Sequence, residues 1–105
     1  MEKPIFIFRN ADGIEYKVYY GKPKFSYRKN GKTNTIRVMG VCDSPELKNP
    51  KIVIDDGLKE KAELATIIEE LIHSHFFEKK EKEVRPLAKN LTKLLYKQGW
   101  RKITP

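Results

Sequence analysis

Three ionisable side chains, Glu69, Glu70 and His73, interrupt an otherwise apolar stretch of the sequence. On an α-helix, residues four apart lie one above the other, so Glu69 and His73 share a face and Glu70 borders it. The motif His-Glu-x-x-His binds zinc through its two histidines and uses its glutamate as a general base. Here Glu69 stands where that motif has its first histidine, and a carboxylate is a less common zinc ligand than an imidazole. The spacing therefore indicates a divalent metal site with an altered ligand set.

A purely structural role explains the same spacing without a metal ion. Glu69 and His73 can form an acid–imidazole pair that stabilises the helix, as residues one turn apart commonly do. A buried carboxylate is costly unless it is paired, protonated or bound to a cation. The spacing alone leaves both interpretations open.

These groups must be positioned by a helix and by the elements around it. Residues 58–77 contain no Gly or Pro and repeat apolar residues at helical spacing, which predicts a central helix buried on most sides. Residues 82–99 predict a second, amphipathic helix, and residues 1–55 predict mostly short strands separated by turns. The expected fold is one α+β domain over residues 1–105. A small antiparallel sheet of three to five strands would pack on two long C-terminal helices.

Composition limits the classes of function and the location. The 105 residues carry a formal net charge of +8, which favours a polyanionic partner but is scattered along the chain. The single cysteine, Cys42, cannot form an internal disulfide, and this fits a reducing compartment. No apolar signal region follows Met1, and no run of residues is long and apolar enough to span a membrane. We therefore expect a cytoplasmic protein that does not bind membranes.

Several short motifs, in a fixed order, give the chain a family resemblance. They are Gly40-x-Cys42-Asp43-x-Pro45, Ile52-x-Ile54-Asp55, Glu63-Leu64-x-Thr66-Ile67-x-Glu69-Glu70-x-x-His73, and an ending of Leu95 followed by Gly99-Trp100-Arg101. In this order they resemble the small zincin-like proteins common in phage genomes, which are related to SprT-like and ImmA/IrrE-type metallopeptidases. The resemblance covers roughly residues 40–101.

The resemblance implies a minimal zincin-like domain and a set of roles. Glu69 falls on the first metal-ligand position, Glu70 on the general base and His73 on the second ligand. Glu81 and Glu83, at the entry to the second helix, are the candidates for the third ligand. One divalent metal, zinc in the first place, would be the cofactor, and a peptide or protein would be the substrate, in the host cytoplasm if the chain is encoded by a phage.

Two other functions remain open at the level of the sequence. The same fold without hydrolytic activity would serve as a protein-binding domain. Alternatively, basic residues next to aromatic ones can contact phosphates and stack on bases, which would make the chain a small nucleic-acid-binding protein. The residues that this alternative singles out are Tyr20, Lys22, Lys24 and Arg28.

Overall fold

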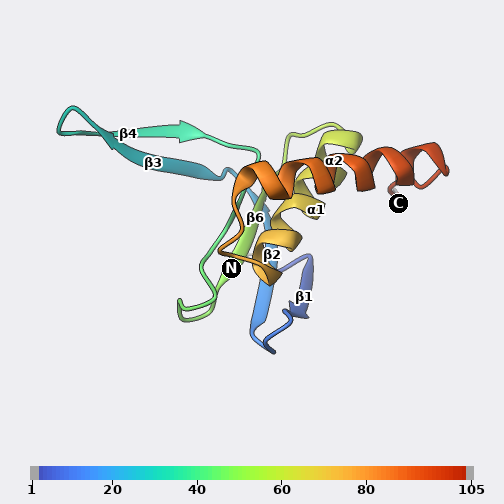
Figure 1. The fold of residues 1–105 in the computed structure, drawn as a ribbon, viewed down its shortest axis with the longest axis horizontal. Coiled ribbons are helices and arrows are strands. Elements are labelled where there is room, and N and C mark those ends of the chain that lie inside the picture. Colours follow the sequence, from blue (N-terminus) through green and yellow to red (C-terminus); the bar gives the residue numbers. More distant parts are fainter. Residues whose placement is uncertain (1–2, 104–105) are drawn as a thin grey trace.

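The computed structural model describes residues 3–103 and contains six strands and two helices. Figure 1 shows them as a small body from which one hairpin projects. The strands are β1 Phe6–Arg9, β2 Glu15–Gly21, β3 Lys24–Lys29, β4 Lys32–Arg37, β5 Gly40–Cys42 and β6 Lys51–Asp55, and the helices are α1 Glu60–His75 and α2 Glu81–Lys97.

The main sheet has four strands in the order β1-β2-β6-β5. Strand β1 pairs antiparallel with β2, and β5 pairs antiparallel with β6. The central pair, β2 and β6, runs parallel, with Val18 opposite Ile52. Strands β3 and β4 form a separate antiparallel hairpin on the connection between β2 and β5. Strand β5 is therefore an edge strand of the main sheet.

The α+β prediction is confirmed, with the main sheet and both helices close to where the sequence placed them. Helix α1 and helix α2 begin and end within two residues of the predicted 58–77 and 82–99. The sheet is mixed, however, and not antiparallel throughout as expected. The chain leaves β2 for the β3–β4 excursion and β5 before it returns in β6, and this long crossover is the type of connection that parallel neighbours require.

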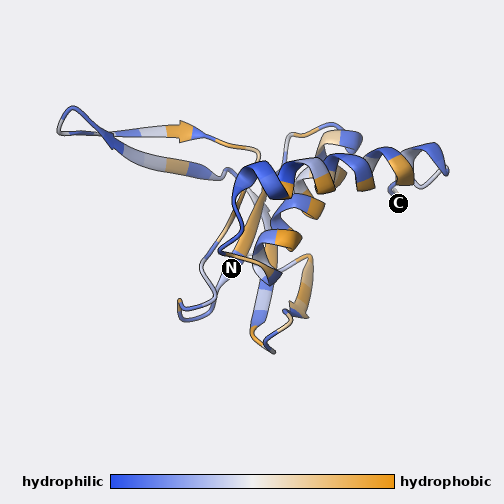
Figure 2. Ribbon diagram, in the orientation of Figure 1, coloured by the Kyte–Doolittle hydropathy of each residue, from blue (hydrophilic) through white to orange (hydrophobic). Residues whose placement is uncertain are grey.

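The hydrophobic core lies between the centre of the sheet and helix α1. It is built on four buried side chains, Tyr16 and Val18 of β2 with Ile52 and Ile54 of β6. Figure 2 shows the apolar residues of β6 in the middle of the body, whereas the β3–β4 hairpin is largely hydrophilic. The two central strands thus carry the core on alternating positions.

The most deeply buried residues of α1 are polar, although the apolar pattern predicted the opposite. The helix packs against β5 and β6, and its buried positions are Glu63, Thr66, Glu70 and Ser74. Most of them have a local partner. Tyr20 donates to Glu63 at 2.9 Å, and the hydroxyls of Thr66 and Ser74 donate to carbonyl oxygens one turn earlier in the helix. In the part of the chain that the structure describes, no ion pair involves Glu70.

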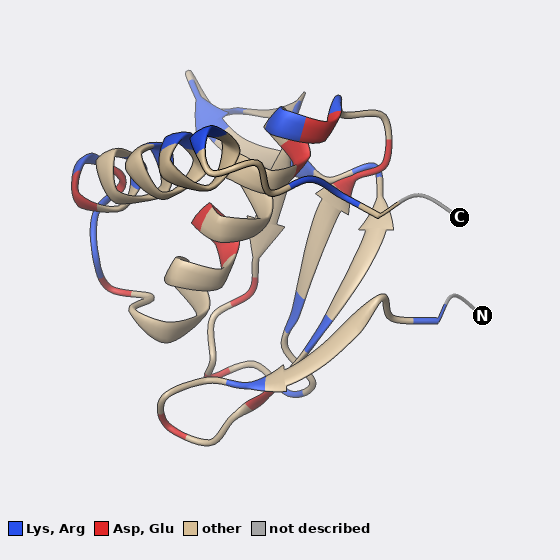
Figure 3. Ribbon diagram, turned by 90° about the vertical axis from the view of Figure 1, so that its right-hand side faces the viewer, with Lys and Arg blue, Asp and Glu red and all other residues tan. Residues whose placement is uncertain are grey.

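Helix α2 lies across α1, on the side away from the sheet (Figure 1). It buries Val84, Ala88 and Thr92, which recur at every fourth position and so form one stripe. Basic residues lie along its outer side (Figure 3). Between residues 3 and 103, neither helix is long and apolar enough to cross a membrane.

Glycine at position 40 lets α1 approach the edge strand closely. A Cβ atom at this position would lie 2.6 Å from Cγ2 of Thr66 and 3.0 Å from Cγ of Glu70. Contacts this short require the helix or the strand to move, and overpacking of this kind is destabilising. Gly40 therefore sets the distance between β5 and the part of α1 that carries Glu69, Glu70 and His73.

We predict that Gly40→Ala lowers the free energy of unfolding by about 1–3 kcal/mol, measured by urea denaturation. Gly57→Ala is the matched control, because its Cβ would meet no atom closer than 3.4 Å. Adding Thr66→Ser to Gly40→Ala removes Cγ2 and should restore part of the loss. Equal stability of the two alanine variants would show that the close approach is not a constraint.

Candidate metal centre

A short connection brings the start of α2 next to the end of α1. Helix α1 ends at His75, and α2 starts at Glu81. The amide of Lys80 donates to the carboxylate of Glu83 at 3.1 Å, which fixes the first turn of α2. With Glu83 held at the N-terminus, Glu81 is free to face the last turns of α1.

Three potential ligands converge at this junction. Glu69 and His73 come from α1, and Glu81 comes from α2. One ligand atom of each residue lies within 4.8 Å of those of the other two. The side chains of His73 and Glu69 are 13% and 23% exposed, whereas that of Glu81 is 52% exposed. The group is therefore enclosed on the α1 side and open to solvent on the α2 side.

The imidazole of His73 has an unsatisfied nitrogen. Nε2 is buried and makes no hydrogen bond among the described residues, although Oε1 of Glu81 lies 2.5 Å away. The carboxylate oxygen of Glu81 therefore lies off the direction in which an N–H at Nε2 would point. A hydrogen bond weakens steeply away from linearity, so the short distance alone does not make one. A buried imidazole nitrogen without a hydrogen bond calls for an explanation.

A basic side chain, Arg85, lies against both carboxylates of the cluster. Its Nε is 2.9 Å from Oε2 of Glu81, one turn earlier in α2, and 3.6 Å from Oε1 of Glu69. The arginine side chain is 73% exposed, so it can swing into solvent at small cost. Arg85 thus occupies, from the solvent side, part of the position that a cation would take.

Burial and mutual repulsion shift the acids of the site. Burial, followed by the nearby carboxylate of Glu81, raises the pKa of Glu69. Burial, followed by the charges of Glu69 and Glu81, raises the pKa of Glu70 to about 8. A bound cation reverses this tendency, because its charge favours the ionised carboxylates. The site is therefore short of positive charge even with Arg85 in place.

Glu70 and the three clustered residues line one open groove with a volume of about 1000 Å³. The groove runs between α1, the start of α2 and strand β5, and Cys42 is on its β5 side. Burial raises the pKa of the Cys42 thiol to about 12, and the charge of Glu70 adds to the effect. Cys42 is therefore a protonated thiol in the absence of a metal ion, and it lies outside the group of Glu69, His73 and Glu81.

The donor set fits one divalent cation. A carboxylate, an imidazole and a second carboxylate are three ligands, the number that catalytic zinc sites use, and carboxylates also suit harder cations. Nε2 of His73, which lies 2.5 Å from Oε1 of Glu81, is the nitrogen that such an ion would engage. To share an ion with bonds of about 2.0–2.2 Å, ligand atoms up to 4.8 Å apart would have to approach one another, whereas Nε2 of His73 and Oε1 of Glu81, which are 2.5 Å apart, would have to separate.

The structure separates the two candidates for the third ligand. Glu81 joins Glu69 and His73, whereas Glu83 caps α2 through the amide of Lys80 and is not part of the cluster. The capping interaction holds the carboxylate of Glu83 at the helix N-terminus, outside the group of possible ligands. His75, which the sequence did not assign to the site, stacks on Phe8 instead.

The residues of the nucleic-acid alternative do not form one site. The hydroxyl of Tyr20 is bonded to Glu63 and Lys102, and Lys22 pairs with Asp56. Lys24 and Arg28 lie exposed on the projecting hairpin. A stacking site that includes Tyr20 is therefore not supported, because its ring and hydroxyl are engaged within the fold.

Arg85 is the residue of the site that the motifs did not reveal. Its only signal in the sequence is the spacing of four residues from Glu81, which is typical of a helical ion pair. The second contact, to Glu69, depends on how the two helices pack and has no local signature.

Comparison of the chain with family models, with curated proteins and with solved structures finds no match. Any role of Glu69, His73 and Glu81 as metal ligands therefore has to be inferred from their geometry in this structure.

We predict that Arg85→Gln tightens the binding of a divalent cation about three- to tenfold, because a competing positive charge next to the ligands is removed. Calorimetric titration with Co²⁺ or Zn²⁺ near pH 7 measures the change. Lys89→Gln removes the same charge from an exposed position of α2 and should leave the affinity unchanged. Weaker binding by Arg85→Gln would mean that the guanidinium supports the site and does not compete.

Proposed function

We propose that this protein is a metal-dependent hydrolase of the zincin-like type, with a peptide or protein as substrate. The observation that carries the proposal is the convergence of Glu69, His73 and Glu81, one ligand atom of each lying within 4.8 Å of the other two, with the His73 side chain 13% exposed. The position of Glu70 in the same groove adds to it. The motifs that resemble phage-type zincin-like proteins agree with this reading. Cys42, a free thiol, is consistent with action in the cytoplasm.

In this proposal each residue has a defined task. Glu69, His73 and Glu81 hold one divalent cation, most simply zinc. When bound, such an ion polarises a carbonyl group and lowers the pKa of water at the site. Glu70 accepts the proton of the attacking water and later delivers it to the leaving amine. Its burial against β5 keeps the carboxylate in one orientation and raises its basicity.

The free edge of β5 is the natural place for the substrate backbone. Hydrogen bonds to β6 occupy only one side of this strand, with Gly40 opposite Ile54 and Cys42 opposite Ile52. Residues 38–42 line the groove. An extended peptide can add to such an edge through main-chain hydrogen bonds, which would carry its carbonyl groups past Glu70.

A protein-binding domain without hydrolytic activity is the second candidate. Two features favour it, namely a glutamate where zincins have their first histidine and the contact of Arg85 with both carboxylates. Both functions use the same groove, so only a measurement of turnover separates them.

The first prediction concerns the ion. Wild-type protein should bind one Zn²⁺ or Co²⁺ per chain, and Glu81→Gln should weaken binding at least tenfold, because it removes an anionic ligand. Glu83→Gln is the matched control, since glutamine keeps the capping interaction and the charge change is the same. Equal affinities of the two variants, or elemental analysis and calorimetry without stoichiometric metal, would contradict the proposed site.

The second prediction concerns the base. Glu70→Gln should lower the rate of peptide hydrolysis by about 10²–10⁴-fold, followed with a quenched fluorescent peptide library on zinc-loaded protein. Metal affinity should change less than in Glu81→Gln. If wild-type protein binds the metal and captures peptides but shows no turnover, the protein-binding function replaces the hydrolase.

A further inference from the structure

The β3–β4 hairpin projects from the body of the molecule and contributes little to its core. It extends away from the sheet and both helices (Figure 1), and the principal extents of the chain are 47 × 29 × 29 Å. All six residues of β3 are exposed, as are all but one of β4. A two-stranded hairpin with no third layer is only marginally stable in water. Its length therefore calls for a role other than packing.

The hairpin also carries charge of one sign only. Its 14 residues from Lys24 to Arg37 contain five basic residues and no acidic residue, so it carries +5 of the net charge of +8. Within residues 3–103, no ion pair involves Lys24, Lys29 or Lys32. The guanidinium of Arg28 donates to the carbonyl oxygen of Gly31, at the turn. Unneutralised positive charge on a projecting element fits a polyanionic partner.

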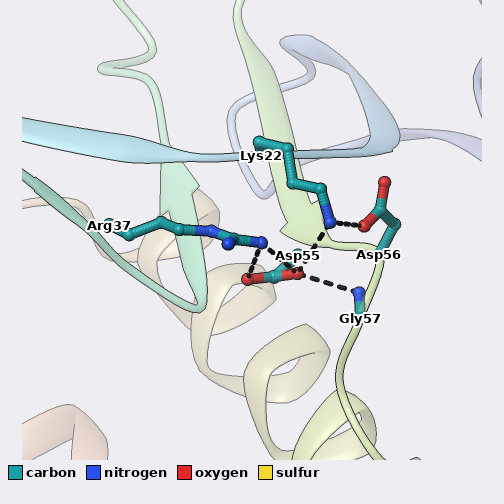
Figure 4. Close-up of polar contacts among 5 residues, drawn as sticks. All are labelled: Lys22, Arg37, Asp55, Asp56 and Gly57. Carbon is teal, nitrogen blue, oxygen red and sulfur yellow. Dashed lines mark hydrogen bonds and ion pairs between the residues drawn. The ribbon is translucent and has the colours of Figure 1, made fainter.

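The base of the hairpin is held by a different pair of basic residues. Figure 4 shows Lys22 and Arg37 on either side of Asp55, at the end of β6. Nη2 of Arg37 is 3.3 Å from Oδ2 of Asp55, and Lys22 also contacts Asp56. The hydrogen bond from the backbone N–H of Gly57 lowers the pKa of Asp55. Burial acts in the opposite direction, and the charges of Arg37 and Lys22 lower the pKa further. The two cations at the base are thus used to orient the hairpin, and those farther out are free.

The two faces of the hairpin differ in chemistry. Alternation along the strands places Lys24, Ser26 and Arg28 on one face, opposite Arg37, Thr35 and Thr33. The other face carries Phe25 and Tyr27, whose rings stack at 6.4 Å, with Ile36 opposite Phe25. Lys29 and Lys32 flank the turn at the tip. Basic and hydroxyl side chains are the groups that contact DNA phosphates, and apolar side chains contact thymine methyl groups.

We propose that the β3–β4 hairpin is a DNA-binding arm that enters the major groove of duplex DNA and contacts phosphates through Lys24, Arg28, Lys29 and Lys32. The major groove of B-DNA, about 12 Å wide, admits a two-stranded β-ribbon, whereas the major groove of A-form RNA is too narrow. A second copy of the chain is a poor occupant, because two arms of charge +5 repel each other. Phe25 and Arg37 also line the groove that contains the candidate metal centre. A DNA duplex held by the arm would therefore lie next to that groove.

The test is fluorescence anisotropy of the full chain with a labelled 20-base-pair duplex, at several salt concentrations and with a chelator present. Arg28→Ala/Lys29→Ala/Lys32→Ala should weaken binding at 100 mM salt at least tenfold and reduce the slope of log K against log salt by about three. The matched control is Lys89→Ala/Lys93→Ala/Lys97→Ala, which removes the same charge from the exposed side of α2 and should cost less than threefold. The chelator makes the result independent of the metal site.

Three outcomes would overturn the proposal. One is an equal or larger loss of affinity in the α2 variant, and another is tighter binding of the single strand or of duplex RNA than of duplex DNA. The third is displacement of the DNA by polyglutamate at equal charge concentration, which would indicate an acidic protein as partner. If the hairpin variant unfolds, hydrogen exchange of the wild-type protein decides the question. Slower exchange on addition of the duplex should be confined to residues 24–37, and protection of α2 instead would contradict the arm.

Discussion

The close approach of helix α1 to the edge strand β5 determines where the α1 residues of the candidate site lie. Gly40 permits it, because any larger side chain would collide with Thr66 and Glu70. The approach presses Glu70 against the strand and turns Glu69 and His73 toward the start of α2. The polar stripe of α1 is consequently buried and several of its apolar residues are only half-buried. That arrangement costs stability unless the polar groups gain partners, and Glu63, Thr66 and Ser74 have partners within the fold.

The two basic regions of the molecule play opposite electrostatic roles. Arg85 places one positive charge where the acids crowd together, and it offsets part of their repulsion. The β3–β4 hairpin, anchored through the contact of Arg37 with Asp55, gathers positive charge on Lys24, Lys29 and Lys32, with which no acid pairs within residues 3–103. Since charge of one sign without compensation is destabilising, its concentration on a projecting hairpin keeps it away from the core. The groove lined by Glu69, Glu70 and His73 meets the hairpin at Arg37, which belongs to both.

Local patterns predicted those features that depend on local geometry. The spacing of Glu69 and His73 placed them on one helical face, and apolar residues at helical spacing marked both helices. Features that depend on packing between distant segments had no such signal. The sequence could not choose between Glu81 and Glu83, because the choice depends on which one caps α2. It also gave no indication of the parallel pairing of β2 with β6 or of the polar character of the buried face of α1, since both follow from the crossover and from Gly40.

We propose that Glu69, His73 and Glu81 share one cation. Crystals grown with equimolar Zn²⁺ and measured at the zinc absorption edge test it most directly. A shared cation predicts one strong anomalous peak per chain, about 2.0–2.2 Å from Nε2 of His73 and from a carboxylate oxygen of each glutamate. The Arg85 guanidinium should then be displaced toward solvent. An absent peak, or a peak at His75 while Arg85 keeps its contacts with both carboxylates, would contradict it.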